Sequence, residues 1–310
     1  MSVKVLGIDT SNYTTSVALV EDGKVVYNFK KLLSVGENER GIRQSDALFH
    51  HTKNLPELFE KLKNTDLSAV SVSVRPRDVE GSYMPCFLAG YSTASAIANV
   101  NGINCHTVSH QAGHVMAALY SSGRLDLKDG KFIAFHVSGG TTEMLLVDPE
   151  KDGFSVKLLG GSVDLHAGQA VDRIGVALGL SFPCGPALER LAMSNTKKIP
   201  RPRISVRDGS CNLSGLENLA LDLYRKTNDK ALTAAFVLRF LSKTLTEMAQ
   251  WLRLTHGELP ILFSGGVMSN RIIAKELREQ LGEVYFAEPA FSADNAAGIA
   301  LLCRAQLLQA

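Results

Sequence analysis

The chain lacks the short patterns that mark several common cofactor sites. None of its five cysteines forms a Cys-x-x-Cys pair, which excludes a zinc ribbon and indicates a reducing compartment. A Walker loop is absent because no glycine-rich stretch continues into Gly-Lys-Ser/Thr, and the dinucleotide pattern Gly-x-Gly-x-x-Gly is absent too. Any nucleotide site in this protein must therefore use a different kind of loop.

Long apolar runs and a strong charge bias are also missing. No run is long enough to cross a membrane, and the first residues lead directly into an expected strand rather than a signal peptide. The formal net charge of +2 is too small to indicate nucleic-acid binding, although it permits a local basic patch. With 45% hydrophobic and 21% charged residues over 310 positions, we expect a cytoplasmic globular protein with two lobes and no membrane partner.

A small polar turn after a buried strand occurs three times in the chain. The first is Asp9-Thr10-Ser11, the second is Ser138-Gly139-Gly140-Thr141, and the third is Ser264-Gly265-Gly266. Glycine accepts positive φ and lets a backbone approach a phosphate closely. One such turn is usually only a tight turn, but three of them predict a duplicated nucleotide-binding architecture.

The spacing of apolar residues predicts alternating strands and helices. Strands are expected at 3–9, 15–21, 24–30, 69–74, 103–108, 132–137, 142–148, 154–159, 260–264 and 284–287. Helices are expected at 44–63, 90–100, 109–120, 168–179, 185–193, 215–226, 230–255, 269–281 and from 293, with a loop over 197–215. The fold class is therefore α/β, with two mixed-sheet lobes and a cleft between them. We place the N-terminal lobe at 1–125, joined by a C-terminal helix at 293–310, and the C-terminal lobe at 126–292.

Two histidines on one predicted helix are candidate metal ligands. His110 and His114 are four residues apart, which puts both imidazoles on one helix face, where they could share a metal ion or be ordinary half-buried histidines. Gln111 stands where a His-Glu-x-x-His peptidase has its glutamate, so that peptidase mechanism is disfavoured. The best third ligand is Asp294, although a helix cap would explain the same residue.

Three further groups of residues are candidates for binding. Asp172 could hold ribose hydroxyls or lie on a solvated helix face, and Asn270 with Arg271 could border an adenine or cap a helix. A basic loop could meet RNA phosphates or be a solvated surface; its residues are Lys197, Lys198, Arg201, Arg203 and Arg207. No aromatic residue interleaves with these cations, so base stacking is not indicated.

Taken in order, these motifs resemble the universal tRNA threonylcarbamoyladenosine-synthase family, also known as the glycoprotease or O-sialoglycoprotein-endopeptidase family. It belongs to the actin, sugar-kinase and heat-shock-ATPase superfamily. The matching stretches are collinear and cover nearly the whole chain: 7–11, His110 with His114, 137–140, 168–172, 185–186, 200–202, 213–216, 264–267, 270–271 and 294–295.

The resemblance implies transfer of a threonylcarbamoyl group from threonylcarbamoyl-adenylate to the N6 amine of a tRNA adenosine. It implies ATP or the adenylate as ligand, and one divalent metal, iron or zinc, held by His110, His114 and Asp294. It also implies nucleotide or substrate contacts from Asp9, Ser11, Ser138, Gly139, Gly140, Thr141, Asp172, Gly185, Gly265, Gly266 and Asn270. The resemblance also implies two partners, a smaller paralogue and a P-loop ATPase helper, and assembly as a homodimer or heterodimer.

Several positions depart from the family pattern. Thr141 replaces the histidine of Gly-Gly-His-Thr, Gln169 replaces a glutamate, and Glu217 replaces the lysine of Ser-Gly-Leu-Lys. Asp164 alone remains of a carboxylate pair, and the Gly-Pro-Gly-Leu loop is replaced by residues 75–79. The alternative to the family reaction is therefore a diverged paralogue that binds nucleotide and metal but uses another acceptor, or that acts as a partner without catalysis.

Overall fold

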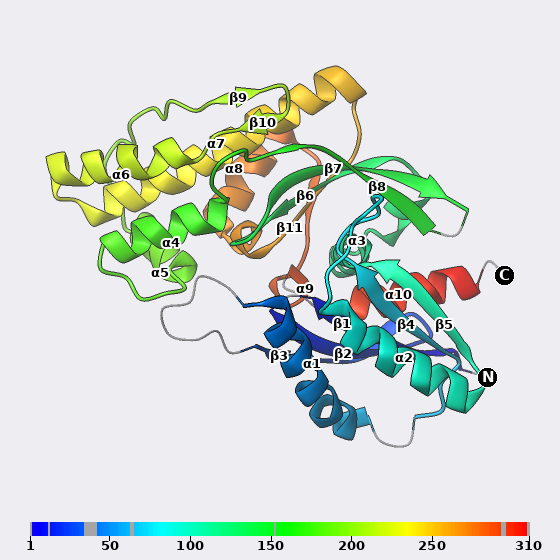
Figure 1. The fold of residues 1–310 in the computed structure, drawn as a ribbon. Coiled ribbons are helices and arrows are strands. Elements are labelled where there is room, and N and C mark those ends of the chain that lie inside the picture. Colours follow the sequence, from blue (N-terminus) through cyan, green and yellow to red (C-terminus); the bar gives the residue numbers. More distant parts are fainter. Residues whose placement is uncertain are drawn as a thin grey trace. The chain divides into compact units, whose positions relative to one another are not determined.

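The computed structural model describes residues 2–11, 13–33, 42–62, 65–151, 153–292 and 296–308 (Figure 1). The chain divides into two compact units. The first comprises Met1–Gly130, Asp148–Val156 and Ala290–Ala310, and the second comprises Lys131–Val147 and Lys157–Pro289. We call them unit 1 and unit 2 and describe each by itself.

Unit 1 contains a five-stranded mixed sheet. Its strands are β1 (Lys4–Ser11), β2 (Thr14–Glu21), β3 (Lys24–Leu32), β4 (Ala69–Arg75) and β5 (Asn104–Ser109), in the order β3-β2-β1-β4-β5. The hairpin pairs β1–β2 and β2–β3 are antiparallel, whereas β1–β4 and β4–β5 are parallel. Both parallel connections run through helices, as parallel pairing requires.

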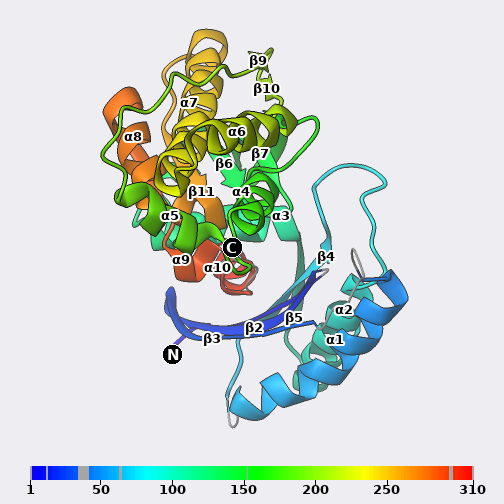
Figure 2. The same ribbon diagram turned by 90° about the vertical axis from the view of Figure 1, so that its left-hand side faces the viewer.

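Helices cover both faces of this sheet. Helices α1 (Gln44–Phe59) and α2 (Phe87–Asn101) lie on one face, and α3 (His110–Ser121) and α10 (Ala297–Leu307) lie on the other (Figure 2). Alternation along β1 explains this, because Leu6 and Ile8 pack with α1 and α2 while Gly7 meets α10. The 3-10 turns Glu60–Leu62 and Leu125–Asp129 follow α1 and α3.

Glycines let α10 approach its neighbours at backbone distance. A Cβ placed on Gly298 would lie 1.9 Å from the carbonyl oxygen of Gly113 in α3, and one on Gly7 would lie 2.3 Å from the carbonyl oxygen of Ala296. No side chain fits in those spaces. The close approach fixes α10 against α3 and β1, and so fixes the helix that carries the two histidines.

Unit 2 repeats the same sheet topology. Its strands are β6 (Phe132–Val137), β7 (Thr142–Glu150), β8 (Gly153–Gly161), β11 (Ile261–Ser264) and β12 (Val284–Phe286), in the order β12-β11-β6-β7-β8. The pair β6–β7 is antiparallel, and β6–β11 and β11–β12 are parallel. Read from its hairpin side, this order matches that of unit 1.

Five helices and a small hairpin complete unit 2. The helices are α4 (Ala167–Ala177), α5 (Gly185–Met193), α6 (Ser214–Thr227), α7 (Lys230–His256) and α8 (Arg271–Leu281). Apolar side chains are buried along most of α7, against which α5, α6 and α8 pack. A 3-10 turn, Gly266–Ser269, joins β11 to α8. The short α9 (Pro289–Ser292) begins at the last residue of unit 2 and otherwise belongs to unit 1.

The predicted α/β class with two mixed sheets is confirmed. The expected loop over 197–215 is partly wrong, because β9 (Val206–Arg207) and β10 (Ser210–Cys211) form a hairpin there. Asp208 and Gly209 close it with φ of 49° and 76°, the paired positive angles of a type I′ turn. The expected start of the last helix at 293 lies outside the described residues. Within the described ranges, none of the helices combines the length and apolar character needed to cross a membrane.

Candidate nucleotide pocket and histidine pair

The two Ser-Gly-Gly turns of unit 2 lie side by side. Strands β6 and β11 are parallel neighbours with Ser264 opposite His136, so the turns that follow them share one sheet edge. Gly265 has a φ of 100°, and a Cβ there would lie 2.3 Å from the carbonyl oxygen of Val137. This position therefore requires glycine for both its conformation and its contact.

The start of α4 closes against the first turn. The amide of Gly168 donates to the carbonyl oxygen of Ser138 at 3.0 Å, and a Cβ on Gly168 would lie 2.7 Å from the Cα of Gly139. Within the turn, the amide of Ser138 donates to the carbonyl oxygen of Thr141 at 2.7 Å. The backbone of 138–141 is thus held in a fixed shape at the N-terminal end of a helix, an arrangement that suits an anion.

A pocket of about 290 Å³ adjoins these turns. Its walls are mostly glycine, proline and aliphatic side chains, with Asp172, Glu189, Ser269 and Asn270 as the polar groups. The lining residues are Gly139, Gly168, Val171, Asp172, Pro183, Gly185, Pro186, Glu189, Leu238, Gly266, Val267, Ser269, Asn270 and Ile273. None of these is cationic, so the pocket suits an uncharged group that donates hydrogen bonds, rather than a phosphate.

Each pocket carboxylate accepts a backbone hydrogen bond with one oxygen, and within the described residues its second oxygen has no hydrogen-bond partner. The Oδ1 atom of Asp172 accepts from the amide of Cys184 at 2.8 Å. The Oε1 atom of Glu189 accepts from the amide of Arg271 at 2.9 Å. Asn270 caps α8, because its Oδ1 atom accepts from the amides of Ile272 and Ile273 at 3.0 and 3.1 Å. Its NH₂ group is then the donor that remains beside the two acceptors.

The pocket unites residues that are far apart in the chain. Of the predicted nucleotide residues, Gly139, Asp172, Gly185, Gly266 and Asn270 line it directly. Ser138, Gly140, Thr141 and Gly265 belong to the two turns at its edge, whereas Asp9 and Ser11 lie in β1 of unit 1. The sequence analysis missed Glu189; its signal was the spacing of four residues from Gly185, which places both on one face of α5.

The two candidate metal ligands converge at the start of α3. The Nε2 atoms of His110 and His114 are 2.9 Å apart. Ser109 caps the helix by accepting from the amide of Ala112 at 3.1 Å, and the amide of Gln111 donates to the carbonyl oxygen of Pro76 at 3.0 Å. Two imidazole nitrogens this close can hydrogen-bond to each other, and imidazole nitrogens are donors that zinc and other transition metals prefer.

A buried carboxylate orients the first of these histidines. Asp9 is fully buried in β1, and its Oδ1 atom lies 3.2 Å from the Nδ1 atom of His110. The same carboxylate accepts hydrogen bonds from the hydroxyls of Ser11 and Ser73. A carboxylate behind a ligating histidine fixes which ring nitrogen carries the proton, which leaves Nε2 as the metal-binding atom. The residues present therefore fit a metal ion.

The predicted third ligand, Asp294, lies outside the described residues. Among the residues that are described, no group of three or more histidine, cysteine, aspartate or glutamate side chains is placed to hold a metal. The structure therefore brings together two of the three predicted ligands.

The basic loop lies along one side of unit 2, and its five cations differ in their surroundings. Lys197 pairs with Asp229 at 2.8 Å and Arg207 with Asp208 at 3.6 Å. Lys198, Arg201 and Arg203 are exposed and have no ion-pair partner in the described part of the chain.

Residues that depart from the family pattern have local structural roles. Gln169 accepts from the backbone amide of His166 at 3.4 Å, as in a capping box, and Glu217 pairs with Arg173 at 3.6 Å. Burial opposes ionisation of Asp164, but hydrogen bonds from Ser214, Leu213 and Leu165 hold its pKa well below the usual range. Asp164 thus ties the end of β8 to the start of α6.

Comparison with known proteins decides the family. Residues 29–301 match the family model of tRNA N6-adenosine threonylcarbamoyltransferase. The chain belongs to this family of transferases. A Thermus thermophilus tRNA N6-adenosine threonylcarbamoyltransferase is 34% identical over 309 residues, covering 97% of this chain and 91% of that protein. The Thermotoga neapolitana protein of the same name is 30% identical, covering 96% and 92%.

Solved structures agree on the fold. Full-length HypF in a phosphate- and nucleotide-bound form aligns with a TM-score of 0.61 at 15% identity; the match covers 99% of this chain and 56% of HypF. Component A of the Acidaminococcus fermentans (R)-2-hydroxyglutaryl-CoA dehydratase aligns with a TM-score of 0.56 at 16% identity, covering 98% and 99%. A ROK family protein from Streptococcus pneumoniae gives 0.51 at 14% identity, covering 100% and 99%. The chain thus has the actin-like ATPase and sugar-kinase fold.

Proposed function

We propose that the protein transfers a threonylcarbamoyl group, or a related carbamoyl group, from an adenylate to the N6 amine of an adenosine in tRNA. The match to transferases of that name over nearly the full chain carries this proposal. The pocket of unit 2 supports it independently, because its polar groups suit the nucleoside part of an adenylate.

The donor is proposed to bind in unit 2. The free oxygens of Asp172 and Glu189 would accept from the ribose hydroxyls and the adenine amine, and the NH₂ group of Asn270 would donate to the base. The backbone amides of Gly139 and Thr141 would face the phosphate, because the pocket itself offers it no cation and the amides of Ser138 and Gly140 donate within the turn. Such preorganised amides stabilise negative charge that develops during transfer.

The reaction exchanges one bond for another at the carbamoyl carbon. The N6 nitrogen of adenosine attacks that carbon, and a C–N bond forms while the C–O bond to the phosphate breaks. AMP leaves with the electron pair, and the proton lost from the amine passes to solvent. The task of unit 2 in this scheme is to hold the adenylate and to stabilise the departing phosphate.

A divalent metal, iron or zinc, would be held by His110 and His114, with Asp294 as the proposed third ligand. When bound, such an ion supplies Lewis-acid polarisation of an oxygen. The contribution of Asp9 would be to fix the ring of His110 through its Nδ1 atom, 3.2 Å away. We therefore assign Asp9 to positioning the histidine, and not to nucleotide binding.

A second candidate function keeps the donor and changes the acceptor. The ion pair between Glu217 and Arg173 places a carboxylate where the family has a lysine, which changes the local charge by two. Such a change would disfavour a polyanionic acceptor near that surface and permit another amine.

A smaller paralogue and a P-loop ATPase are proposed as helpers for the tRNA reaction.

The test is transfer of labelled threonine from threonylcarbamoyl-adenylate by purified, metal-loaded protein, with and without the helpers. Labelled tRNA is the expected result. Adenylate consumption that depends on the protein but leaves tRNA unlabelled would favour the second candidate, and an unconsumed adenylate would contradict both.

A further inference from the structure

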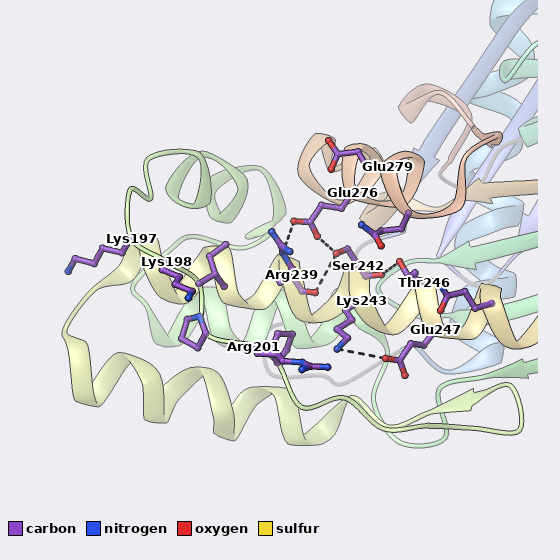
Figure 3. A pocket seen from close by; sticks show the side chains of 15 residues that line it. Lys197, Lys198, Arg201, Arg239, Ser242, Lys243, Thr246, Glu247, Glu276 and Glu279 are labelled. Atoms are coloured by element: carbon purple, nitrogen blue, oxygen red, sulfur yellow. Dashed lines mark hydrogen bonds and ion pairs between the residues drawn. The ribbon is translucent and has the colours of Figure 1, made fainter.

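A large groove lies on unit 2 beside the basic loop. It shares no lining residue with the nucleotide pocket. It has a volume of about 660 Å³ and runs between residues 197–202 and the helices α7 and α8 (Figure 3). Its charged lining residues are Lys197, Lys198, Arg201, Arg239, Lys243, Glu247, Glu276 and Glu279. The function proposed above makes no use of it.

The carboxylates of the groove are already neutralised. Glu276 accepts from the Nε atom of Arg239 at 2.8 Å and from the buried hydroxyl of Ser242 (Figure 3). Glu247 lies 3.8 Å from the ammonium group of Lys243.

Two further charged lining residues, Glu279 and Lys197, are also paired. Glu279 lies 3.8 Å from Lys275, and Lys197 pairs with the helix cap Asp229 at 2.8 Å. All three carboxylates that line the groove are thus paired with other cations, and none of them pairs with Lys198 or Arg201 of the basic loop.

Three cations form the surplus. Lys198 and Arg201 line the groove and Arg203 follows directly; all three are exposed and none has an ion pair or side-chain hydrogen bond within the described residues. We call them the cationic bank. An uncompensated cluster of this kind attracts an extended polyanion.

The backbone that carries the cationic bank is stiff. Pro200 and Pro202 fix their own φ and favour extended conformations at the residues before them. Ile199 and Ile204 pack against the core of unit 2, and Pro202 is buried. The bank residues alternate with these inward positions and so point outward. Little backbone entropy is left to lose when a ligand binds.

We propose that the cationic bank binds phosphates of the acceptor RNA away from the reacting adenosine, an inference that rests on the proposed function. Arginine and lysine on a rigid segment suit phosphodiester oxygens. The groove has no aromatic lining residue on which a base could stack. Binding at the bank is therefore independent of base sequence and supplies affinity and orientation.

The test measures binding of unmodified tRNA, without donor, by fluorescence anisotropy at several salt concentrations. The variant is Lys198→Gln/Arg201→Gln/Arg203→Gln. Its matched control, Lys24→Gln/Lys157→Gln/Lys226→Gln, removes the same charge from exposed lysines that also lack ion-pair partners in the described chain. We expect the bank variant to bind at least about tenfold more weakly near 0.1 M salt, with a salt dependence reduced by about three ions.

Two further readouts separate recognition from folding and from chemistry. Adenylate affinity and melting temperature should be unchanged in the bank variant, and KM for tRNA should rise while kcat stays the same. Wild-type affinity and salt dependence in the bank variant would overturn the inference. The inference would also be overturned if the control variant lost as much tRNA affinity as the bank variant, or if the wild-type protein did not bind tRNA. A protein that binds tRNA through the bank but transfers nothing would contradict the proposed function alone.

Discussion

At the scale of single residues, the proposed chemistry depends on a few polar groups that are buried or that use only part of their hydrogen-bonding capacity. Asp9 is the clearest case, since a carboxylate without exposure is stable only when its oxygens are well bonded. Its partners Ser11, Ser73 and His110 supply those bonds. The carboxylate and the histidine therefore act as one unit, and a change in the first should be felt at the second.

Asp9→Asn should weaken metal binding by about tenfold or more. The neutral side-chain amide of asparagine would orient the His110 ring less strongly than the carboxylate does, and the ring would be less basic. The measurement is a titration with Zn²⁺ against a chromophoric chelator. Ser11→Ala is the control, since it removes a hydrogen bond from the same carboxylate without touching the histidine. Equal zinc affinity in wild type and Asp9→Asn would show that Asp9 does not position the ligand.

Asp172→Asn should weaken adenine-nucleotide binding by about 10- to 100-fold. The new side chain can still accept from the amide of Cys184, but it replaces the free, charged acceptor by a donor. Calorimetric titration with AMP measures the effect. The matched control is Asp222→Asn on α6, an exposed aspartate that pairs with Arg225. An unchanged affinity would remove Asp172 from the ribose site.

The candidate site could be predicted only in part at this scale. Glycines after strands and the pair His110 and His114 have strong local patterns, and the pocket does gather five of the predicted residues. Whether Asn270 caps a helix or faces a ligand depends on which of its atoms is used, and that needs the three-dimensional structure. Glu189 was missed because its spacing of four residues from Gly185 is a weak signal: a glutamate there is equally typical of the solvated face of an amphipathic helix.

At the scale of elements, close packing of helices sets the geometry of unit 1. Helix α10 meets α3 at Gly298, where an added methyl group would collide with the backbone carbonyl oxygen of Gly113. The helix that presents His110 and His114 is thus positioned by contacts that tolerate no added volume.

Gly298→Ala should destabilise the protein by about 1–3 kcal/mol, because the overpacked helix must shift. Gly215→Ala is its control: Gly215 is likewise the second residue of its helix, but a methyl group added there would have no atom within 4 Å. There the change should be neutral or stabilise by up to about 1 kcal/mol. Urea unfolding compares the two, and equal effects would contradict the packing argument.

Most elements followed from apolar periodicity, because buried strands and amphipathic helices carry the strongest patterns. The hairpin at 206–211 was missed since two-residue strands have no periodicity, although Asp208-Gly209 is a turn signal. Strand order could not be read from the sequence either. It depends on which strands meet in space, as when β6 pairs with β11 more than a hundred residues later.

At the scale of the whole molecule, stability depends on pH through a buried histidine. His51 in α1 is fully buried, and its Nδ1 atom lies 2.8 Å from the hydroxyl of Thr15. Burial lowers the pKa of His51 to about 4, so the ring is neutral in the folded protein near pH 7.

The free energy of unfolding should therefore fall as the pH is lowered from about 6.5 to about 4. In that window His51 binds a proton in the unfolded chain but not in the folded chain. The free energy of unfolding therefore falls by on the order of 3 kcal/mol. Denaturant unfolding between pH 7.5 and 4.5 measures it. His51→Gln should flatten this pH dependence; an equally steep curve in His51→Gln would rule out this histidine as the cause.

The two units repeat one sheet topology, and each carries its own part of the proposed chemistry. The most direct test of the central claim is the amount of threonylcarbamoyladenosine in tRNA after incubation with threonylcarbamoyl-adenylate and the metal-loaded protein, with helpers present. Nucleoside analysis should show product with the wild type and with Asp222→Asn, and at least about tenfold less with Asp172→Asn at limiting donor. Product formed equally by all three, or by none, would contradict the account.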